Sequence, residues 1–162
     1  LLRSHGMATL TYDRFQGHAS GYDVVALGYN YRSDEIHSAI GLCQLRKLDS
    51  FNSRRRELFR KYCEELEGSD RVQVPFRHRD ISQSTCHIMS VLLTRDALKV
   101  RQRLREAGVQ TSKHYDLIPS FGNYRDSSFK NSVEGLENLL TLPLYPSLSE
   151  ENISYIVKTI NG

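Results

Sequence analysis

The sequence predicts a mixed fold of helices and strands, an α+β or α/β sandwich. Two long helical patterns come first, between residues 33 and 67. Short apolar runs of strand length then alternate with shorter amphipathic helical patterns up to the C-terminus. Strands interleaved with helices in this way fold as helices packed against a sheet. At 162 residues the chain is long enough to bury a core of its own.

The composition is typical of a soluble globular protein, with 39% apolar residues, 25% charged residues and a net charge of +3. No apolar run approaches the length of a membrane span, and no signal peptide is visible. We therefore expect a cytoplasmic protein without a membrane partner. The first residue is Leu1, which suggests an excised or processed piece. Three cysteines without C-x-x-C spacing predict buried, reduced thiols at Cys43, Cys63 and Cys86.

A tyrosine-rich loop leads directly into the first long helix, in the stretch Gly28 to Asp49. We expect Ser33 to be the N-cap, because its hydroxyl can accept a hydrogen bond from an unpaired amide of the first turn. Asp34 and Glu35 place negative charge at the positive end of the helix dipole. An apolar stripe at helical spacing predicts that this helix is buried in a larger body. The stripe consists of Ile36, Ala39, Ile40, Leu42, Cys43, Leu45 and Leu48.

The regions on either side of this helix are simpler. Residues 9–27 have no helical period, so we expect an ordered loop with a short strand at Asp23 to Leu27. A second amphipathic helix is expected to start near Asp49 and to stop at Gly68. Its basic run favours a solvated helix face over a nucleic-acid-binding patch. The run consists of Arg54, Arg55, Arg56, Arg60 and Lys61.

From Val72 onward the pattern changes to short strands and helices. We expect a short strand at Val72 to Phe76 and a central strand at Cys86 to Thr94. An inward-facing helix should run from Arg95 to Ala107 and end at Gly108. Alternation predicts a strand at Val109 to Tyr115.

Two further helices complete the prediction. Asn131 and Glu134 form a capping-box pattern before a short helix carrying Val133, Leu136 and Leu140. The last helix is expected to begin at Ser149, with Leu148 and Ile153 forming a hydrophobic staple. It should bury Ile153, Ile156, Val157 and Ile160.

Four sequence blocks, taken in order, resemble those of the pyridoxal-phosphate-dependent nucleotide-sugar aminotransferases of the DegT/DnrJ/StrS type. They are LRSHGM (Leu2 to Met7), NYRSDEIHSAIGLCQLRKLD (Asn30 to Asp49), HY (His114, Tyr115) and LPLYPSLSEENI (Leu142 to Ile153). The resemblance implies the last large-domain helix and the small C-terminal domain of a fold-type I aminotransferase. Residues 1–67 would then end the large domain, and residues 68–162 would form the small domain.

The resemblance also implies a site shared between the two protomers of a homodimer. Asn30 resembles the asparagine that reaches across the interface to the phosphate of pyridoxal 5'-phosphate, and Tyr31 follows it as a second cofactor-binding residue. An amide suits this role because it donates to a phosphate oxygen without adding charge. Arg32 would bind phosphate or carboxylate oxygens of the substrate. Without the resemblance, Asn30 is a turn residue and Arg32 a surface ion-pairing residue.

Three more residues are implied on the substrate side. His114 and Tyr115 match the pair that lies by the substrate sugar. The sequence departs from the family at Asp116 to Phe121, which leaves the sugar specificity open. Ser33 and His37 also stand where the family prefers methionine and glutamine. His5 either hydrogen-bonds near the cofactor or stabilises its own loop.

The family's catalytic residues are not matched in this sequence. In the family a Schiff-base lysine and an acid beside the pyridine nitrogen precede the histidine-glycine block, whereas the first lysine here is Lys47. Lys113 adjoins His114 but matches no family position. We therefore expect no catalytic residue in this chain. The histidine and cysteine spacing predicts no metal site, and no glycine-rich P-loop or Rossmann motif is present.

Three hypotheses of function follow. The first is the C-terminal part of an aminotransferase that moves an amino group from an amino acid, usually glutamate, to a keto-sugar nucleotide. The second is a non-catalytic interaction or regulatory module derived from that family. The third, a DNA-binding regulator, depends only on the arginine cluster. A lysine-bearing segment encoded upstream of Leu1 would favour the first, and an initiator codon near Leu1 the second.

Overall fold

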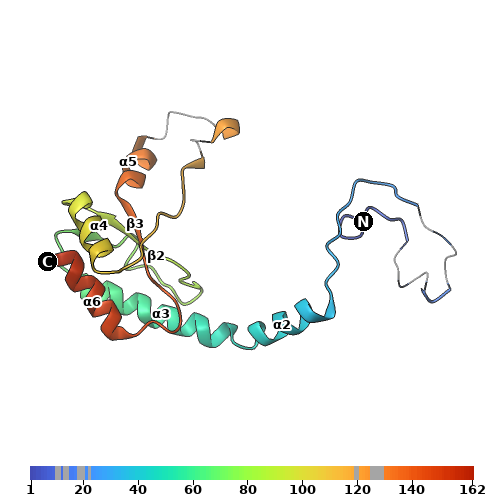
Figure 1. Cartoon of the computed structure of the whole chain (residues 1–162), viewed down its shortest axis with the longest axis horizontal. Coiled ribbons are helices and arrows are strands. Elements are labelled where there is room, and N and C mark those ends of the chain that lie inside the picture. The colour runs from blue at the N-terminus through green and yellow to red at the C-terminus, as the bar shows by residue number, and fades with distance from the viewer. Residues whose placement is uncertain (10–11, 13–14, 18–20, 22, 119–120, 125–129) are drawn as a thin grey trace. The chain divides into compact units, whose positions relative to one another are not determined.

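The computed structural model describes residues 1–162 except 10–11, 13–14, 18–20, 22, 119–120 and 125–129, and except the side chains of residues 130, 131 and 134. The chain divides into two compact units, Leu1–Lys47 and Leu48–Gly162. Figure 1 draws both, and each is described by itself.

In the first unit, two backbone segments pair with each other. The amide of His5 donates to the carbonyl of Tyr29 at 2.9 Å, and the amide of Tyr31 donates to the carbonyl of Arg3 at 2.9 Å. Between these bonds lies an antiparallel bridge from Ser4 to Asn30, and Met7 forms a second bridge. That second bridge pairs Met7 with Val24. A strand was expected at Asp23 to Leu27, and within this range only Val24 forms a bridge. That prediction is wrong, because the pairing there extends over a single residue.

Two glycines allow this close pairing. A Cβ on Gly28 would lie 2.0 Å from the amide nitrogen of Gly6, and a Cβ on Gly6 would lie 1.8 Å from the carbonyl oxygen of Ala26. Gly6 also has a φ of 71°, in the region that glycine adopts without strain. Any side chain at either position would therefore push the two segments apart.

Helix α2 (Glu35–Leu45) begins one residue later than the predicted cap implies. Asp34 is the N-cap, and its carboxylate accepts a hydrogen bond from the amide of His37 at 2.8 Å. This bond lowers the pKa of Asp34. Ser33 is therefore not the cap. Its hydroxyl instead lies 2.8 Å from that of Ser38.

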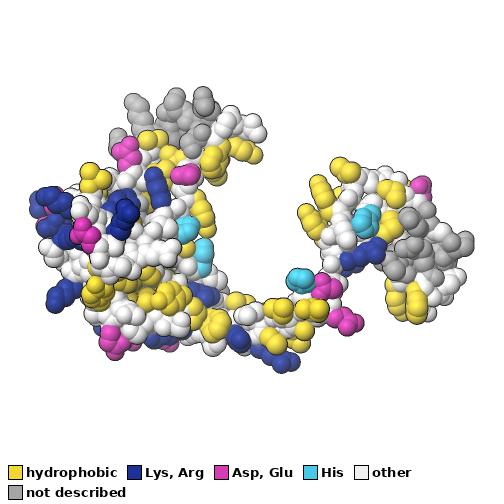
Figure 2. All heavy atoms as spheres, in the orientation of Figure 1, with side chains coloured by type: hydrophobic (Ala, Val, Ile, Leu, Met, Phe, Trp, Pro, Cys, Tyr) yellow, Lys and Arg dark blue, Asp and Glu magenta, His cyan; other side chains and the backbone are white. Residues whose placement is uncertain are grey.

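Helix α2 is not buried by the described residues of this chain, so its predicted burial in a larger body stays a prediction. Ile36 is 74% exposed and Leu45 is 64% exposed, and the helix has no buried residue. Apolar side chains are visible along α2 in Figure 2. The reason is that no described part of Leu1–Lys47 packs against this stripe. Cys43 lies on the stripe and is likewise exposed.

The second unit contains a three-stranded antiparallel sheet in the order β1-β2-β3. β1 (Val72–Gln73) is shorter than expected, and β2 (Met89–Leu93) is the central strand, as predicted. β3 (Leu139–Leu142) was not predicted as a strand, and Leu140 belongs to it and not to the preceding helix. The expected strand Val109 to Tyr115 is wrong, because only Ser112 pairs, in an isolated bridge to Thr141.

One face of the sheet packs against helices α3 (Leu48–Glu65), α4 (Ala97–Glu106) and α6 (Glu150–Asn161), as Figure 1 shows. Because Leu58 and Tyr62 of α3 are fully buried in this core, α3 belongs to the second unit. The boundary between the two compact units therefore lies between Lys47 and Leu48. The core includes Leu58, Tyr62, Met89, Val91, Val100, Leu104, Leu140, Leu142, Ile153 and Ile160.

The helix ends in this unit largely follow the sequence. The Ser149 hydroxyl accepts from the amide of Asn152 at 3.2 Å, and Leu148 and Ile153 are both buried, which confirms the predicted cap and staple. α3 and α4 are followed by Gly68 and Gly108, with φ of 75° and 72°. Helix α5 (Lys130–Asn138) begins before the predicted cap at Asn131. The side chains of that capping pair lie outside the described residues. A short 3-10 helix, η2, covers Gly122–Tyr124.

Two arginines of the basic run on α3 hold a loop in place. Arg55 Nε donates to the carbonyl of Thr85 at 3.0 Å, and Arg56 donates to the carbonyl of Ser84 at 3.1 Å.

The structure describes all three cysteines, and of these only Cys86 is buried. It precedes β2 and does not open it. Cys63 is half-buried, and burial raises the pKa of its thiol. Among the described residues, no helix is long and apolar enough to cross a membrane.

Candidate functional site

The segment Tyr29–Arg32 is extended, because its backbone pairs with residues 3–5. Successive side chains of an extended segment point to opposite faces. Tyr29 and Tyr31 accordingly stack on each other, with ring centroids 5.2 Å apart and planes inclined by 13°. Asn30 and Arg32 are therefore presented together on the other face. The sequence placed these four residues in one loop, and the pairing assigns them to two faces.

Ser4 is a neighbour of this site that sequence reasoning missed. It pairs with Asn30 between two flanking hydrogen bonds, which is the arrangement in which opposing side chains come closest. Ser4 is 7% exposed, whereas Asn30 is exposed. No local pattern marks a serine in this position, because its partner lies 26 residues away along the chain (30 − 4).

The donor set on this face fits a phosphate or carboxylate group. Asn30 supplies an amide and Arg32 a guanidinium, both exposed. Neither side chain forms a hydrogen bond or ion pair with the residues that the structure describes, so both remain free to bind a ligand. A guanidinium and an amide together donate several hydrogen bonds to anionic oxygens. These residues therefore fit the phosphate of pyridoxal 5'-phosphate or the carboxylate of an amino acid.

His5 has two features that bear on its two predicted roles. Its φ is 59°, and its backbone amide donates to the carbonyl of Tyr29. The backbone of His5 thus holds the Tyr29–Arg32 segment, which agrees with the loop-stabilising role. Its imidazole is exposed and so remains available to a ligand.

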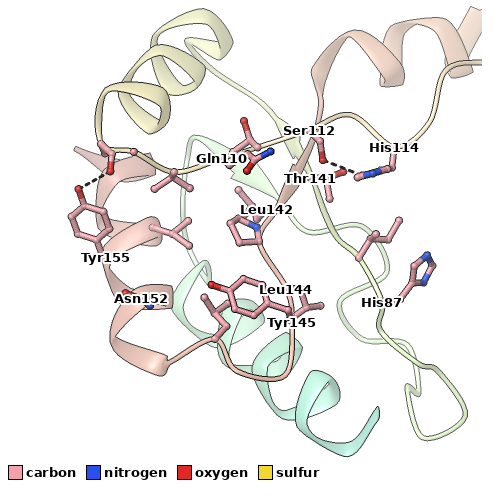
Figure 3. Close-up of a pocket in the computed structure, with 18 residues that line it drawn as sticks. His87, Gln110, Ser112, His114, Thr141, Leu142, Leu144, Tyr145, Asn152 and Tyr155 are labelled. Carbon is pink, nitrogen blue, oxygen red and sulfur yellow. Dashed lines mark hydrogen bonds between the residues drawn. The ribbon is translucent and has the colours of Figure 1, made fainter. Parts of the chain in front are cut away.

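In the second unit, His114 lies at a pocket of about 560 Å³. His114 lines the pocket, and its Nδ1 is 3.1 Å from the hydroxyl of Ser112 (Figure 3). The rings of His114 and Tyr115 meet edge to face at 5.0 Å. Tyr115 is 67% exposed and does not line the pocket. Of the predicted pair, only His114 belongs to it.

The first unit contains one lysine, Lys47, at its C-terminal end. In the second unit Lys61 pairs with Glu65 at 3.2 Å and Lys99 with Asp96 at 3.6 Å. Within the described parts of the chain, no three histidine, cysteine or acidic side chains gather as metal ligands would.

Comparison with known proteins gives consistent matches along the chain. The family model of the DegT/DnrJ/EryC1/StrS aminotransferase family matches residues 1–161. The chain is 26% identical over 176 residues to the spore coat polysaccharide biosynthesis protein SpsC of Bacillus subtilis, covering 99% of this chain and 44% of SpsC.

Two solved structures are also similar. The sugar aminotransferase CalS13 of Micromonospora echinospora has a TM-score of 0.81 and 26% identity, over 98% of this chain and 42% of CalS13. The PLP form of Spr1654 of Streptococcus pneumoniae has a TM-score of 0.77 and 26% identity, over 99% of this chain and 41% of Spr1654. The chain thus spans less than half the length of these relatives. Its fold is that of part of a fold-type I aminotransferase, and the chain belongs to the DegT/DnrJ/EryC1/StrS aminotransferase family.

Proposed function

We propose that this chain is the C-terminal part of a pyridoxal-phosphate-dependent aminotransferase that converts a keto-sugar nucleotide to an amino-sugar nucleotide. The amino donor is an amino acid, in our proposal glutamate. The product serves surface polysaccharides or the sugars of secondary metabolites. The observation that carries the proposal is the family match over residues 1–161. The names of SpsC, a polysaccharide biosynthesis protein, and CalS13, a sugar aminotransferase, support the substrate class.

The cofactor role falls to the segment Tyr29–Arg32. Asn30 donates its amide to the cofactor phosphate, and Tyr31, on the opposite face of the segment, is proposed as a second cofactor-binding residue that contacts another part of the cofactor. Pyridoxal 5'-phosphate supplies the electron sink that lets an amino group leave one carbon and join another. The support is the exposure of Asn30 and Arg32 on one face, without partners among the described residues. The PLP form of the relative Spr1654 supports the choice of cofactor.

The substrate roles are divided between the two units. Arg32 binds the carboxylate of the amino acid or a phosphate of the nucleotide sugar, because its guanidinium can donate two parallel hydrogen bonds. His5 provides a further donor. His114 and Tyr115 bind the sugar. The hydrogen bond between the Ser112 hydroxyl and His114 Nδ1 orients the imidazole for this role.

The protein is proposed to act as a homodimer in the cytoplasm, with each protomer lending Asn30 to the site of the other. The Schiff-base lysine is proposed to lie outside this chain. Residues 1–67 are proposed to belong to the large domain and 68–162 to the small domain. Neither nucleic acid nor a membrane is a proposed partner.

The direct test uses the full-length protein loaded with cofactor, supplied with glutamate and a panel of keto-sugar nucleotides. We expect an amino-sugar nucleotide, detected by its mass, together with 2-oxoglutarate. Absence of transfer from any amino acid to any keto sugar would contradict the proposal.

A second test concerns the 162-residue chain. Mixed with pyridoxal phosphate and reduced with borohydride, it should give no stoichiometric lysine adduct in a peptide map. A single adduct at Lys113, abolished by Lys113→Ala, would show that the chain carries its own cofactor lysine.

The exposed apolar stripe of α2 favours one alternative, a non-catalytic interaction module derived from the same family. The two candidates differ in what the reading frame before Leu1 encodes. A lysine-bearing segment there supports the enzyme, and an initiator codon next to Leu1 supports the module.

A further inference from the structure

The pairing between Ser112 and Thr141 stops after a single pair. These residues exchange two backbone hydrogen bonds, of 2.8 and 3.2 Å. In an antiparallel ladder the next pair of this kind would join Gln110 to Pro143. Pro143 has no backbone N–H, and its carbonyl already accepts the hydroxyl of Tyr62 at 2.9 Å. The ladder therefore ends, and the backbone N–H and C=O of Gln110 form no hydrogen bond with the described residues.

The pocket of about 560 Å³ lies at this break in the ladder (Figure 3). Gln110 and Pro143 both line it, so the two residues that do not pair border the same cavity. Beyond them the hydroxyl of Tyr155, on α6, donates to the carbonyl of Ala107 at 3.2 Å. The break thus leaves a slot beside the end of β3, and hydrogen bonds close the slot at both ends.

Thr141 adds a third unpaired polar group to this pocket. The residue lines the pocket and is 5% exposed, and its Oγ1 has no hydrogen-bond partner among the described residues. Its neighbours Leu140 and Leu142 pack in the core, so alternation along β3 directs Thr141 away from that core. A buried hydroxyl without a partner destabilises the fold and calls for an explanation. An occupant of the pocket would supply the missing partner.

The lining defines the chemistry of that occupant. None of the lining residues is an aspartate, glutamate, lysine or arginine, so a charged group would find no counter-charge there. Leu142 and Leu144 supply apolar walls. An unpaired backbone N–H next to an unpaired C=O is the pattern to which an added β-strand binds. An extended, uncharged main chain satisfies both groups of Gln110, and a further peptide group of the same strand can bond Thr141 Oγ1.

We infer that this pocket holds an extended segment of the same polypeptide, from the part that lies outside these 162 residues, bound as a strand against Gln110. The source of the segment rests on the proposed function, in which this chain is part of a longer enzyme. The chain matches 44% of SpsC and 42% of CalS13, so more than half of each relative lies outside the matched region. Along the chain, Gln110 and His114 lie on opposite sides of the Ser112 pair, so the segment does not use His114.

Hydrogen exchange resolved to single amides tests this inference in the full-length protein. The Gln110 amide should exchange about tenfold or more slowly there than in the 162-residue chain, because an amide bonded in a sheet exchanges only when the sheet opens. Protection of the Val91 amide on β2 in both samples shows that the unit is folded. Equal exchange of the Gln110 amide in the two proteins would overturn the inference.

The same measurement separates other occupants of the pocket. Protection of Gln110 that appears only after pyridoxal phosphate or a keto-sugar nucleotide is added would assign the pocket to a small ligand. Protection that rises with the concentration of the 162-residue chain would assign it to a second copy. Either result would overturn the inference.

Overlapping synthetic peptides that cover the rest of the polypeptide identify the segment. One of them should shift the amide resonances of Gln110 and Thr141 in the 162-residue chain. Methylation of the backbone nitrogens of that peptide should abolish the shifts, because the peptide can then no longer donate to the carbonyl of Gln110. Shifts that survive this methylation, or no shift from any peptide, would contradict the inference.

The key variant is Thr141→Val, which keeps the shape of the side chain and removes the hydroxyl. It should weaken peptide binding about two- to tenfold, as expected for one lost neutral hydrogen bond. It should also raise the urea midpoint of the free chain, because an unpaired buried hydroxyl is gone. A merely structural role of Thr141 would lower that midpoint. The control is Thr85→Val at an exposed threonine outside the pocket, where binding should not change.

The inference and the proposed function fail in different ways. If Gln110 is protected in the full-length protein and no amino group is transferred, the function is wrong and the bound segment stands. If amino groups are transferred and Gln110 exchanges equally in both proteins, the bound segment is wrong and the function stands.

Discussion

The hydroxyl of Tyr62 donates to the carbonyl of Pro143 at 2.9 Å and so joins α3 to the residue that follows β3. Tyr62 is fully buried, and burial raises the pKa of its hydroxyl. Leu142, just before this carbonyl, is 2% exposed. A single hydrogen bond therefore joins α3, which the sequence predicts, to the end of β3, which the sequence does not predict.

Tyr62→Phe should lower the free energy of unfolding of the chain by about 1–2 kcal/mol at neutral pH, because the carbonyl of Pro143 loses its donor without regaining water. Urea unfolding measures this loss. Tyr155→Phe is a matched control, because it removes a hydroxyl-carbonyl bond from a ring that is 50% exposed and should lose less. An equal loss of unfolding free energy in both variants would contradict the prediction that the buried hydrogen bond of Tyr62 contributes more to stability than the exposed one of Tyr155.

The same tyrosine predicts a pH dependence. The pKa of the Tyr62 hydroxyl in the folded chain lies above its value of about 10 in the unfolded chain. At a pH between these two pKa values, Tyr62 is therefore protonated in the folded chain and ionised in the unfolded chain. The contribution of Tyr62 to stability is therefore complete below about pH 10 and falls as the pH rises towards the folded pKa. Unfolding free energies measured from pH 8 to 11 should fall more steeply for the natural chain than for Tyr62→Phe. Parallel curves would contradict the prediction.

Gly28→Ala should separate the two paired segments of the first unit, because the new Cβ would lie 2.0 Å from the amide nitrogen of Gly6. We expect a loss of about 1–3 kcal/mol in the stability of this pairing, the usual cost of overpacking. Hydrogen exchange at the amides of His5 and Tyr31 reports it. Gly21→Ala is the control, because a Cβ there meets nothing within 4 Å. Unchanged protection of both amides in Gly28→Ala would show that the close approach is not required.

Asn30 is predicted to act in the site of the partner subunit. In the full-length enzyme, Asn30→Ala should weaken cofactor retention by about 1.5–3 kcal/mol, the value of a hydrogen bond to a charged group. Its own folding should be nearly unchanged, because the side chain is exposed. Equilibrium dialysis of the cofactor and urea unfolding separate the two effects.

The decisive arm mixes two inactive full-length variants, one without the Schiff-base lysine and one without the Asn30 and Arg32 side chains. If the segment acts across the interface, one site of the mixed dimer carries both defects and the other carries neither, so activity returns in part. Proven subunit exchange without any return of activity would assign the segment to its own protomer.

The basic run on α3 should bind duplex DNA weakly and lose that binding at moderate salt, because Arg55 and Arg56 already hold carbonyls of the following loop. Fluorescence anisotropy at several salt concentrations measures it. Arg55→Ala should instead destabilise the chain by about 1–3 kcal/mol, whereas Arg105→Ala, at an exposed position, should have little effect. Sequence-selective DNA binding in physiological salt would contradict this reading.

Local patterns in the sequence were sufficient for most of the helices. The cap at Ser149, the staple of Leu148 and Ile153 and the glycine after α4 all act within one or two turns, so their signals lie close together in the chain. Ser33 and Asp34 show the limit of such signals, because both residues can cap and only the backbone geometry selects Asp34. The sequence blocks were also sufficient to predict the family that the family model then showed.

Only the tertiary structure decided the strands, the burial and the site neighbours. β3 exists because Leu139–Leu142 finds β2 as its partner, and the segment at Ser112 fails as a strand because it finds only one residue to pair with. The stripe of α2 has the pattern of a buried helix, yet burial requires a covering surface, and the first unit supplies none in its described residues. Ser4 beside Asn30 and Thr141 in its pocket depend on pairing between distant segments. Such pairing is set by the packing of the whole unit, which no short stretch of sequence encodes.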